Sequence, residues 1–168
     1  MKTDYINQYS ILRIQKPHYG MTSIRFLEDI KKIIIKNNLS SILDYGCGKS
    51  NLLDEIKKSL NVEIYKYDPA IPKYSKKVKS KIDFIICTDV LQHVPLWDLT
   101  RVLLELKNYN CKGFIHIRCT PYHTILPNGE LANCTVFPCE WWENKLKEFF
   151  KKVDRYKTDY DTVSFIVE

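Results

Sequence analysis

The feature that most constrains the fold is a short apolar run that ends at glycines and is followed by a helical pattern. Ser41–Tyr45 is β-prone and stops at the turn Gly46–Gly48, after which apolar residues recur at helical spacing from Leu52 to Leu60. A strand, a glycine turn and a helix in this order are the first half of a βαβ unit. This order therefore predicts an α/β fold with a parallel sheet.

The same alternation continues along the chain. The nearly continuous apolar run Ile82–Cys87 is typical of a strand buried on both faces. The expected strands are 41–45, 62–67, 82–87, 113–118, 153–158 and 162–167, and the expected helices are 24–34, 52–60, 96–106 and 140–151. The last two strands predict a closing antiparallel hairpin. We expect a three-layer α/β sandwich with a mostly parallel sheet, in which the short crossover between Asp68 and Lys81 is reduced.

Length and hydropathy bound the organisation of the chain. Its 168 residues, 45% of them hydrophobic, fit a single domain over residues 1–168 with a full-sized core. No apolar run approaches the ~20 residues that a membrane-spanning helix needs. Met1–Tyr5 also lacks the apolar core of a secretory signal. We expect a cytoplasmic protein with no membrane partner, whose oligomeric state the sequence does not indicate.

The net charge of +6 comes mainly from lysine, since only five of the 26 cations are arginine. Recognition of bases and phosphates favours the planar guanidinium, so this excess is weak evidence for a nucleic-acid partner. A solvated surface accounts for most of it. The uneven clusters at Lys66–Lys81 and Lys145–Lys157 leave open a basic face that attracts an anionic substrate or a polynucleotide.

The six cysteines contain no C-x-x-C pair, so free thiols are expected. One subset, Cys119, His123, Cys134 and Cys139, offers four soft ligands in a short stretch. Zinc sites more often have a tight pair of ligands at each end, so we expect no metal here. The zinc-stapled alternative would be an interaction domain that loses its fold on chelation.

Residues suited to binding a nucleoside follow two neighbouring strands. Gly46 and Gly48 allow a sharp turn and a close approach to a ligand, and the start of the next helix offers unpaired N–H groups. Asp68 ends the following strand, where a carboxylate can accept hydrogen bonds from both hydroxyls of a ribose. Ser50 stands where a pyrophosphate-binding turn has its third glycine, which disfavours a dinucleotide.

Three segments, Ile42–Gly48, Asp68-Pro69 and Phe84–Pro95, resemble in order and spacing the signature segments of class I S-adenosylmethionine-dependent methyltransferases. The resemblance covers roughly residues 40 to 120 and implies S-adenosylmethionine as cofactor and S-adenosylhomocysteine as product. It also implies a Rossmann-like sheet of seven strands, or a reduced form of it where the third crossover is short, because the terminal hairpin is similar to that family's sixth and seventh strands. The cofactor-binding residues that it implicates are Asp44, Gly46, Cys47, Gly48, Asp68, Pro69, Thr88, Asp89 and Val90. A softer resemblance, at Asn128–Val136, is to small methyltransferases of bacteria and their viruses.

The sequence departs from the family pattern at two places, and its N-terminal segment carries three tyrosines. Ser50 replaces a common third glycine, and the third crossover is short, which bears on how the adenine edge is held. Tyr5, Tyr9 and Tyr19 precede the first expected helix, where related folds often place a lid over the cofactor.

Methyl transfer asks little acid–base chemistry of the protein, because the cofactor carries the reactivity and the protein aligns donor and acceptor and excludes water. A general base is needed where the acceptor must lose its proton early, as a hydroxyl does. His93, just past the strand at 82–87, is the candidate, and its alternative role is a helix-start histidine bonded to the backbone. His123 is a second candidate, as a substrate contact.

The long irregular stretch from Thr120 to Pro138 leaves the carboxyl end of a strand, where open α/β sheets bind ligands. We interpret it as the wall facing the acceptor, the alternative being a surface excursion without a role. The favoured function is methyl transfer to the oxygen or nitrogen of a small polar acceptor. The alternatives are an RNA methyltransferase, whose binding would weaken steeply with salt, and a cofactor-binding but non-catalytic partner subunit.

Overall fold

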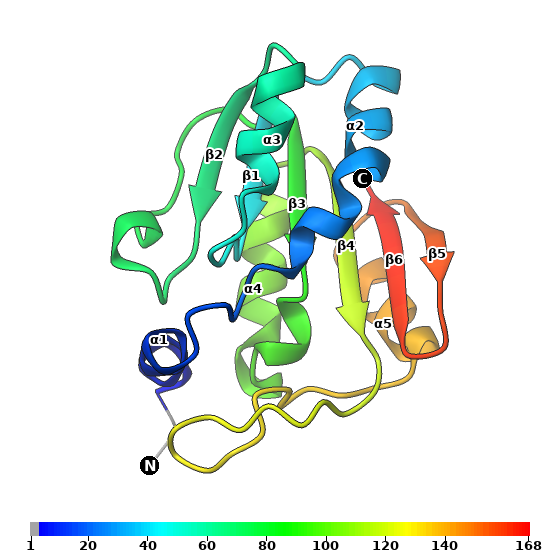
Figure 1. Cartoon of the computed structure of the whole chain (residues 1–168). Helices are drawn as coiled ribbons and strands as arrows, with labels where there is room; N and C mark the ends of the chain where they lie inside the picture. The colour runs from blue at the N-terminus through cyan, green and yellow to red at the C-terminus, as the bar shows by residue number, and fades with distance from the viewer. Residues whose placement is uncertain (1–3) are drawn as a thin grey trace.

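The computed structural model describes residues 4–168 (Figure 1). Residues 1–3, part of the segment from which the lack of a secretory signal is predicted, lie outside the described residues. The strands are β1 (Ser41–Tyr45), β2 (Glu63–Tyr67), β3 (Phe84–Thr88), β4 (Lys112–Arg118), β5 (Val153–Thr158) and β6 (Thr162–Val167). The helices are α1 (Tyr5–Gln15), α2 (Leu27–Lys36), α3 (Leu52–Ser59), α4 (Leu96–Asn108) and α5 (Cys139–Lys147).

The six described strands form one sheet in the order β2-β1-β3-β4-β6-β5. β1 pairs in parallel with β2 and β3, and β3 pairs in parallel with β4. β6 is antiparallel to both β4 and β5, which confirms the mostly parallel sheet and the closing hairpin. The sheet has six described strands and not the full seven of the expected fold. The crossover from β2 to β3 is short and carries only a 3₁₀ turn at Pro72–Tyr74 in place of a helix and a strand. Pro69 and Pro72 lack the N–H that a ladder would need there.

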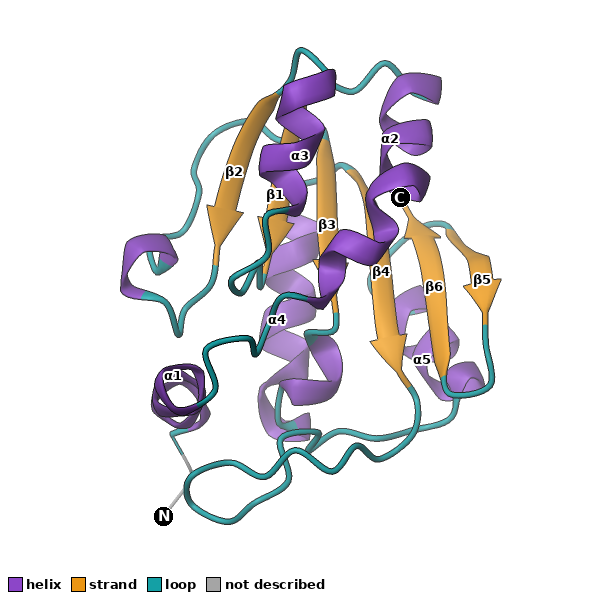
Figure 2. Ribbon diagram, viewed as in Figure 1, coloured by secondary structure: helices purple, strands orange, loops and turns teal. Residues whose placement is uncertain are grey.

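Helices cover both faces of the sheet (Figure 2). Alternate side chains of β1 point to opposite faces, as in any strand. Ile42 packs in a core cluster with α2 and α3, whereas Leu43 packs in a second cluster with α4 and α5. The three layers expected from the alternating periods are therefore present.

The long irregular stretch forms a loop of residues 119–138 between β4 and α5, called here the β4–α5 loop. Figure 1 shows this loop and α1 lying beyond the carboxyl ends of the parallel strands. The two share a small apolar cluster in which Leu12 of α1 packs with Leu126 and Ala132 of the loop. The helix α1 is absent from the sequence prediction.

The outer strand β5 is largely exposed, and its register with β6 shifts between Arg155 and Lys157. This irregularity makes the hairpin's outer edge uneven. Within residues 4–168, no helix is long and apolar enough to cross a membrane.

Candidate active site

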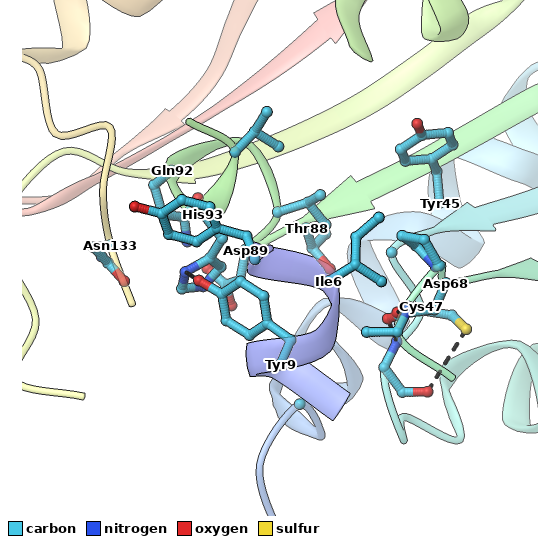
Figure 3. A pocket seen from close by; sticks show the side chains of 18 of the residues that line it. Ile6, Tyr9, Tyr45, Cys47, Asp68, Thr88, Asp89, Gln92, His93 and Asn133 are labelled. Carbon is cyan, nitrogen blue, oxygen red and sulfur yellow. Dashed lines mark hydrogen bonds between the residues drawn. The ribbon is translucent and has the colours of Figure 1, made fainter. Parts of the chain in front are cut away.

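A cavity of about 650 Å³ lies at the carboxyl ends of the parallel strands. Its volume falls in the range of sites that hold small molecules. Its walls come from α1 and the segment after it, the glycine turn after β1, the residues that follow β2 and β3, and the β4–α5 loop. Figure 3 shows some of these side chains at close range. The topology thus brings together segments that are far apart in the sequence.

The glycine turn lines the cavity, and its geometry requires glycine. Gly46 has φ +77°, and a Cβ there would lie 2.3 Å from a methyl carbon of Val90. Gly48 has φ +55°, and a Cβ there would lie 2.4 Å from the carbonyl oxygen of Gly20. Both positions combine a left-handed backbone with a close neighbour. Ser50, the departure from a third glycine, accepts a hydrogen bond at 3.1 Å from the N–H of Leu52, the first residue of α3.

Asp68 lies at the end of β2 and lines the same cavity as the glycine turn. Its side chain is 3% exposed and is held on both oxygens. The Gly48 N–H donates to Oδ2 at 3.0 Å, and the Ala70 N–H donates to Oδ1 at 2.9 Å. Arg13 of α1 donates to Oδ1 at 3.1 Å and to Oδ2 at 2.8 Å, a bidentate ion pair. Pro69, another residue expected to bind the cofactor, also lines the cavity.

Asp44 is the one expected cofactor residue that does not line the cavity. It is 1% exposed, and its Oδ2 has no hydrogen-bond partner. Burial raises the pKa of Asp44 to about 7, against a smaller opposing effect of the Lys66 charge. Cys47, Gly46 and Gly48 line the cavity, whereas the buried carboxyl group of Asp44 does not.

The residues that follow β3 also face the cavity, as expected for Thr88, Asp89 and Val90. Asp89 has φ +56°, a left-handed conformation that Asp tolerates better than most residues. Its Oδ2 accepts hydrogen bonds from the hydroxyl of Thr22 at 2.9 Å and from the guanidinium of Arg25 at 2.7 Å. The segment after α1 is thereby fixed to the end of β3.

His93 lines the cavity from the short 3₁₀ turn Leu91–His93. Its Nδ1 lies 3.0 Å from the carbonyl oxygen of Ala132 and 3.1 Å from the hydroxyl of Tyr9. A carbonyl oxygen only accepts, so Nδ1 carries the proton and Nε2 keeps its lone pair. Burial lowers the pKa of His93, which favours this neutral form. Figure 3 shows the ring of Tyr9 next to that of His93.

The β4–α5 loop contributes Tyr122, Thr124 and Asn133 to the cavity wall. Its later part is bound along the turn that carries His93: the Thr135 N–H donates to the Gln92 carbonyl at 3.1 Å. His123 does not line the cavity and is exposed on the loop. The structure therefore brings His93, but not His123, to the other expected site residues.

The four residues weighed as zinc ligands do not gather into a metal site, since no group of three or more His, Cys, Asp or Glu within residues 4–168 is placed to hold an ion. Cys119 and Cys139 alone come close, with their sulfur atoms 2.9 Å apart at the two ends of the β4–α5 loop. This contact joins the ends of the loop.

Sequence reasoning missed Arg13 and Arg25, which line the cavity and hold its other residues, and it named Tyr9 only as part of a segment where related folds place a lid. It also missed Gln92 and Asn133, two buried amides of the cavity wall, each with one side-chain atom that lacks a hydrogen-bond partner. A signal for the arginines is present in the sequence. Two of only five arginines fall within the first 25 residues of a lysine-rich chain. The guanidinium is chosen over an ammonium where bidentate pairing matters, so their placement indicates fixed contacts.

A family model described as a methyltransferase domain matches residues 19–113 of the chain. No curated protein matches it in sequence. Among solved structures, the methyltransferase domain of bacterial CtHen1 superposes with a TM-score of 0.63 at 16% identity, covering 88% of this chain and 98% of that one.

Two further structures were solved with S-adenosylhomocysteine. The 1,6-didemethyltoxoflavin-N1-methyltransferase of Burkholderia thailandensis, which also holds 1,6-didemethyltoxoflavin, has a TM-score of 0.64 at 9% identity and covers 96% of this chain and 85% of its own. The DhpI complex has a TM-score of 0.57 at 11% identity, covering 99% of this chain and 98% of that one. At these identities the likeness is one of fold.

Proposed function

Because the chain belongs to the methyltransferase-domain family, whose model matches residues 19–113, we propose that it transfers a methyl group from S-adenosylmethionine to the oxygen or nitrogen of a small polar acceptor. The observation that carries the proposal is the shared cavity of Gly46 and Asp68, which follow neighbouring strands. A glycine turn and a carboxylate facing one cavity are what a bound nucleoside requires.

The residues of the cavity fit this cofactor in a definite order. Gly46, Cys47 and Gly48 would lie against its methionine part, because all three line the cavity at a glycine turn, where the backbone can approach a ligand closely. Asp68 and Pro69 would lie at the ribose. Thr88, Asp89 and Val90, which also line the cavity, would lie near the sulfonium. When bound, the cofactor supplies an electrophilic methyl group on a positively charged sulfur.

His93 is proposed to take the proton from the acceptor. Its Nδ1–H is held by Ala132, which orients the ring and leaves the lone pair on Nε2. A lowered pKa keeps the imidazole unprotonated at neutral pH. The ring sits in the cavity wall beside Tyr9, so a hydroxyl or amine placed next to it would be shielded from bulk water.

The acceptor is proposed to be small, because the described chain offers the cofactor-binding sheet and one loop wall for contacts with it. Tyr122, Thr124 and Asn133 supply aromatic and polar contacts on that wall. The toxoflavin-precursor methyltransferase of similar fold holds a small molecule next to its cofactor product, which agrees with this class of acceptor.

The test combines binding with turnover. Purified protein is analysed by mass spectrometry for co-purified S-adenosylhomocysteine, and by calorimetry for binding of the same compound. Labelled S-adenosylmethionine is then supplied with a panel of small acceptors and with RNA. Binding with label transfer to a small molecule supports the proposal, and transfer only to RNA would replace the acceptor class. Binding without transfer would indicate a partner subunit, and the lack of any binding would contradict the cofactor assignment.

A further inference from the structure

The carboxylate proposed to hold the ribose has no free position for it. A carboxylate offers about four lone-pair sites, two on each oxygen. In Asp68, Oδ1 accepts from Arg13 Nη1 and from the Ala70 N–H, and Oδ2 accepts from Arg13 Nη2 and from the Gly48 N–H. All four distances lie between 2.8 and 3.1 Å. A ribose diol can therefore bind Asp68 only if one of these donors leaves.

Of the four donors, only those of Arg13 are able to leave without rebuilding the site. The N–H groups of Gly48 and Ala70 belong to the backbone that forms the cavity. Arg13 stands on α1, which has a single buried residue, Leu12. Leu12 packs against the β4–α5 loop and not against the sheet. Apart from the Arg13–Asp68 pair, α1 is bonded to the strand ends by the Ser10 hydroxyl, which donates to the Ala70 carbonyl at 2.8 Å, and by Lys49, which donates to the Arg13 carbonyl at 2.7 Å. A helix held this way can separate from the sheet at small cost.

The same face of α1 also covers the proposed base. Tyr9 precedes Arg13 by one helical turn, so both side chains project to one side. The Tyr9 hydroxyl donates to the Ala132 carbonyl at 2.5 Å and lies 3.1 Å from His93 Nδ1. One helix thus contacts both ends of the cavity, the carboxylate through Arg13 and the imidazole through Tyr9.

We propose that α1 is a gate whose closed position is autoinhibitory: Arg13 occupies the carboxylate of Asp68, and the ribose of the cofactor binds there only after Arg13 withdraws. The inference rests on the proposed function and adds a regulatory step to it. The charge of Arg13 also opposes binding of S-adenosylmethionine in the closed position, because a guanidinium inside the cavity repels a cationic sulfonium. Movement of α1 would release Tyr9 from the loop at the same time and open the acceptor end.

The gate predicts that removing a cation from the cavity wall strengthens binding of the cofactor product. If only a fraction of molecules is open, the apparent dissociation constant equals the intrinsic constant divided by that fraction. Removing Arg13 should therefore tighten binding of S-adenosylhomocysteine, by roughly tenfold for a bidentate charged contact. Were Arg13 instead a ligand of the cofactor, its removal would weaken binding.

Calorimetry with S-adenosylhomocysteine on the full chain distinguishes these cases. Arg13→Ala should bind about tenfold more tightly than wild type, and Arg13→Lys, which keeps the charge but loses the bidentate geometry, should fall between them. Lys16→Ala, which removes an exposed cation at the end of the same helix, is the matched control and should bind like wild type. Equal or weaker binding by Arg13→Ala overturns the gate.

Hydrogen exchange gives a second readout that requires no turnover. In the ligand-free protein, the amides of α1 should exchange faster in Arg13→Ala than in wild type or Lys16→Ala. Adding S-adenosylhomocysteine to wild type should speed exchange in α1 while slowing it at Gly46–Gly48. Protection of α1 by the ligand, or unchanged α1 exchange in Arg13→Ala, overturns the gate while leaving the cofactor assignment intact. If neither wild type nor Arg13→Ala binds S-adenosylhomocysteine, the proposed function is overturned, and the ribose step is overturned with it.

Discussion

Each of the five arginines pairs with at least one carboxylate, but their surroundings differ. The side chains of Arg13 and Asp68 are 13% and 3% exposed, whereas those of Arg25 and Asp89 are 43% and 21% exposed. Exposed pairs contribute little to stability, and a buried pair leaves a costly unpaired charge when one partner is removed. Arg13 is thus the arginine whose pairing matters most to the site.

Gly46 should be far less tolerant of a side chain than Gly129. Both have positive φ, +77° and +86°, but a Cβ at Gly46 meets Val90 at 2.3 Å, whereas one at Gly129 meets nothing within 4 Å. We expect Gly46→Ala to lower the free energy of unfolding by about 2–4 kcal/mol and Gly129→Ala by about 1 kcal/mol. Urea denaturation of the two variants measures the difference, and equal losses would show that the contact with Val90 is easily relieved.

Asp44 should make the protein less stable as the pH rises. An unfolded Asp titrates near 3.8, and burial raises the folded pKa to about 7. Between these values the folded state holds a proton that the unfolded state has lost, so the unfolding free energy falls as pH increases through this window. Asp44→Asn should therefore gain little over wild type at pH 4 and about 4 kcal/mol at pH 8.

Urea denaturation of wild type and Asp44→Asn at pH 4, 6 and 8 checks this prediction. Glu28→Gln, at a side chain that is 74% exposed, is the control and should show no such trend. A gain for Asp44→Asn that is the same at every pH would mean that Asp44 is ionised throughout.

His93→Ala should lower turnover by about 100-fold or more for a hydroxyl acceptor and leave the affinity for S-adenosylhomocysteine within about twofold. Because burial lowers the pKa of His93, the wild-type rate should decline only at pH values below the usual imidazole range. The variant should lack that acid decline. His123→Ala, outside the cavity, is the comparison and should keep the wild-type rate; a reversed outcome would exchange the roles of the two histidines.

At the scale of elements, periodicity predicted the strands and the four helices that pack on the sheet, because each buries an apolar face whose spacing is visible in the sequence. The structure confirms the alternation, the hairpin and the reduced crossover. The family resemblance, too, is confirmed. The helix α1 was missed because it buries one residue, Leu12, and so carries no apolar stripe. Contacts of Tyr9 and Arg13 join segments remote in sequence, which no local pattern indicates.

The helix α5 contains two adjacent tryptophans with different roles. Trp142 is 0% exposed in the core, whereas Trp141 is only partly buried and stacks on Phe137 with ring centroids 4.0 Å apart. Neither lines the cavity. Trp142→Ala should lower the free energy of unfolding by about 3–5 kcal/mol, and Trp141→Ala by clearly less. Chemical denaturation followed by circular dichroism checks this order, and a larger loss at Trp141 would contradict it.

At the scale of the whole molecule, the cavity draws on the segments that follow β1, β2 and β3 and on the β4–α5 loop, so occupancy should stabilise the fold against global unfolding. At a ligand concentration 100 times the dissociation constant, linkage adds about 2.7 kcal/mol. For a chain of this size, S-adenosylhomocysteine should then raise Tm by about 5–10 °C. Thermal unfolding with and without ligand measures the shift.

Asp68→Ala should lose most of this ligand-induced shift, because the proposed ribose acceptor is gone. Its own Tm should fall as well, since the bidentate ion pair with Arg13 is lost. Asp154→Ala, on the exposed strand β5, should keep both the baseline and the shift. If S-adenosylhomocysteine raised the Tm of Asp68→Ala as much as that of wild type, the assignment of Asp68 to the ribose would be wrong.

The uneven outer strand β5 bears on how copies of the chain meet. A flat, regular outer strand offers unpaired backbone groups that recruit strands of other molecules and seed fibres or exchanged hairpins. Here the irregularity between Arg155 and Lys157, with Asp154 and both cations on exposed positions, interrupts that template with a bend and charges of both signs. Straightening this strand by replacing its charged residues with β-branched ones would therefore be expected to convert a self-limiting sheet into an aggregation-prone one.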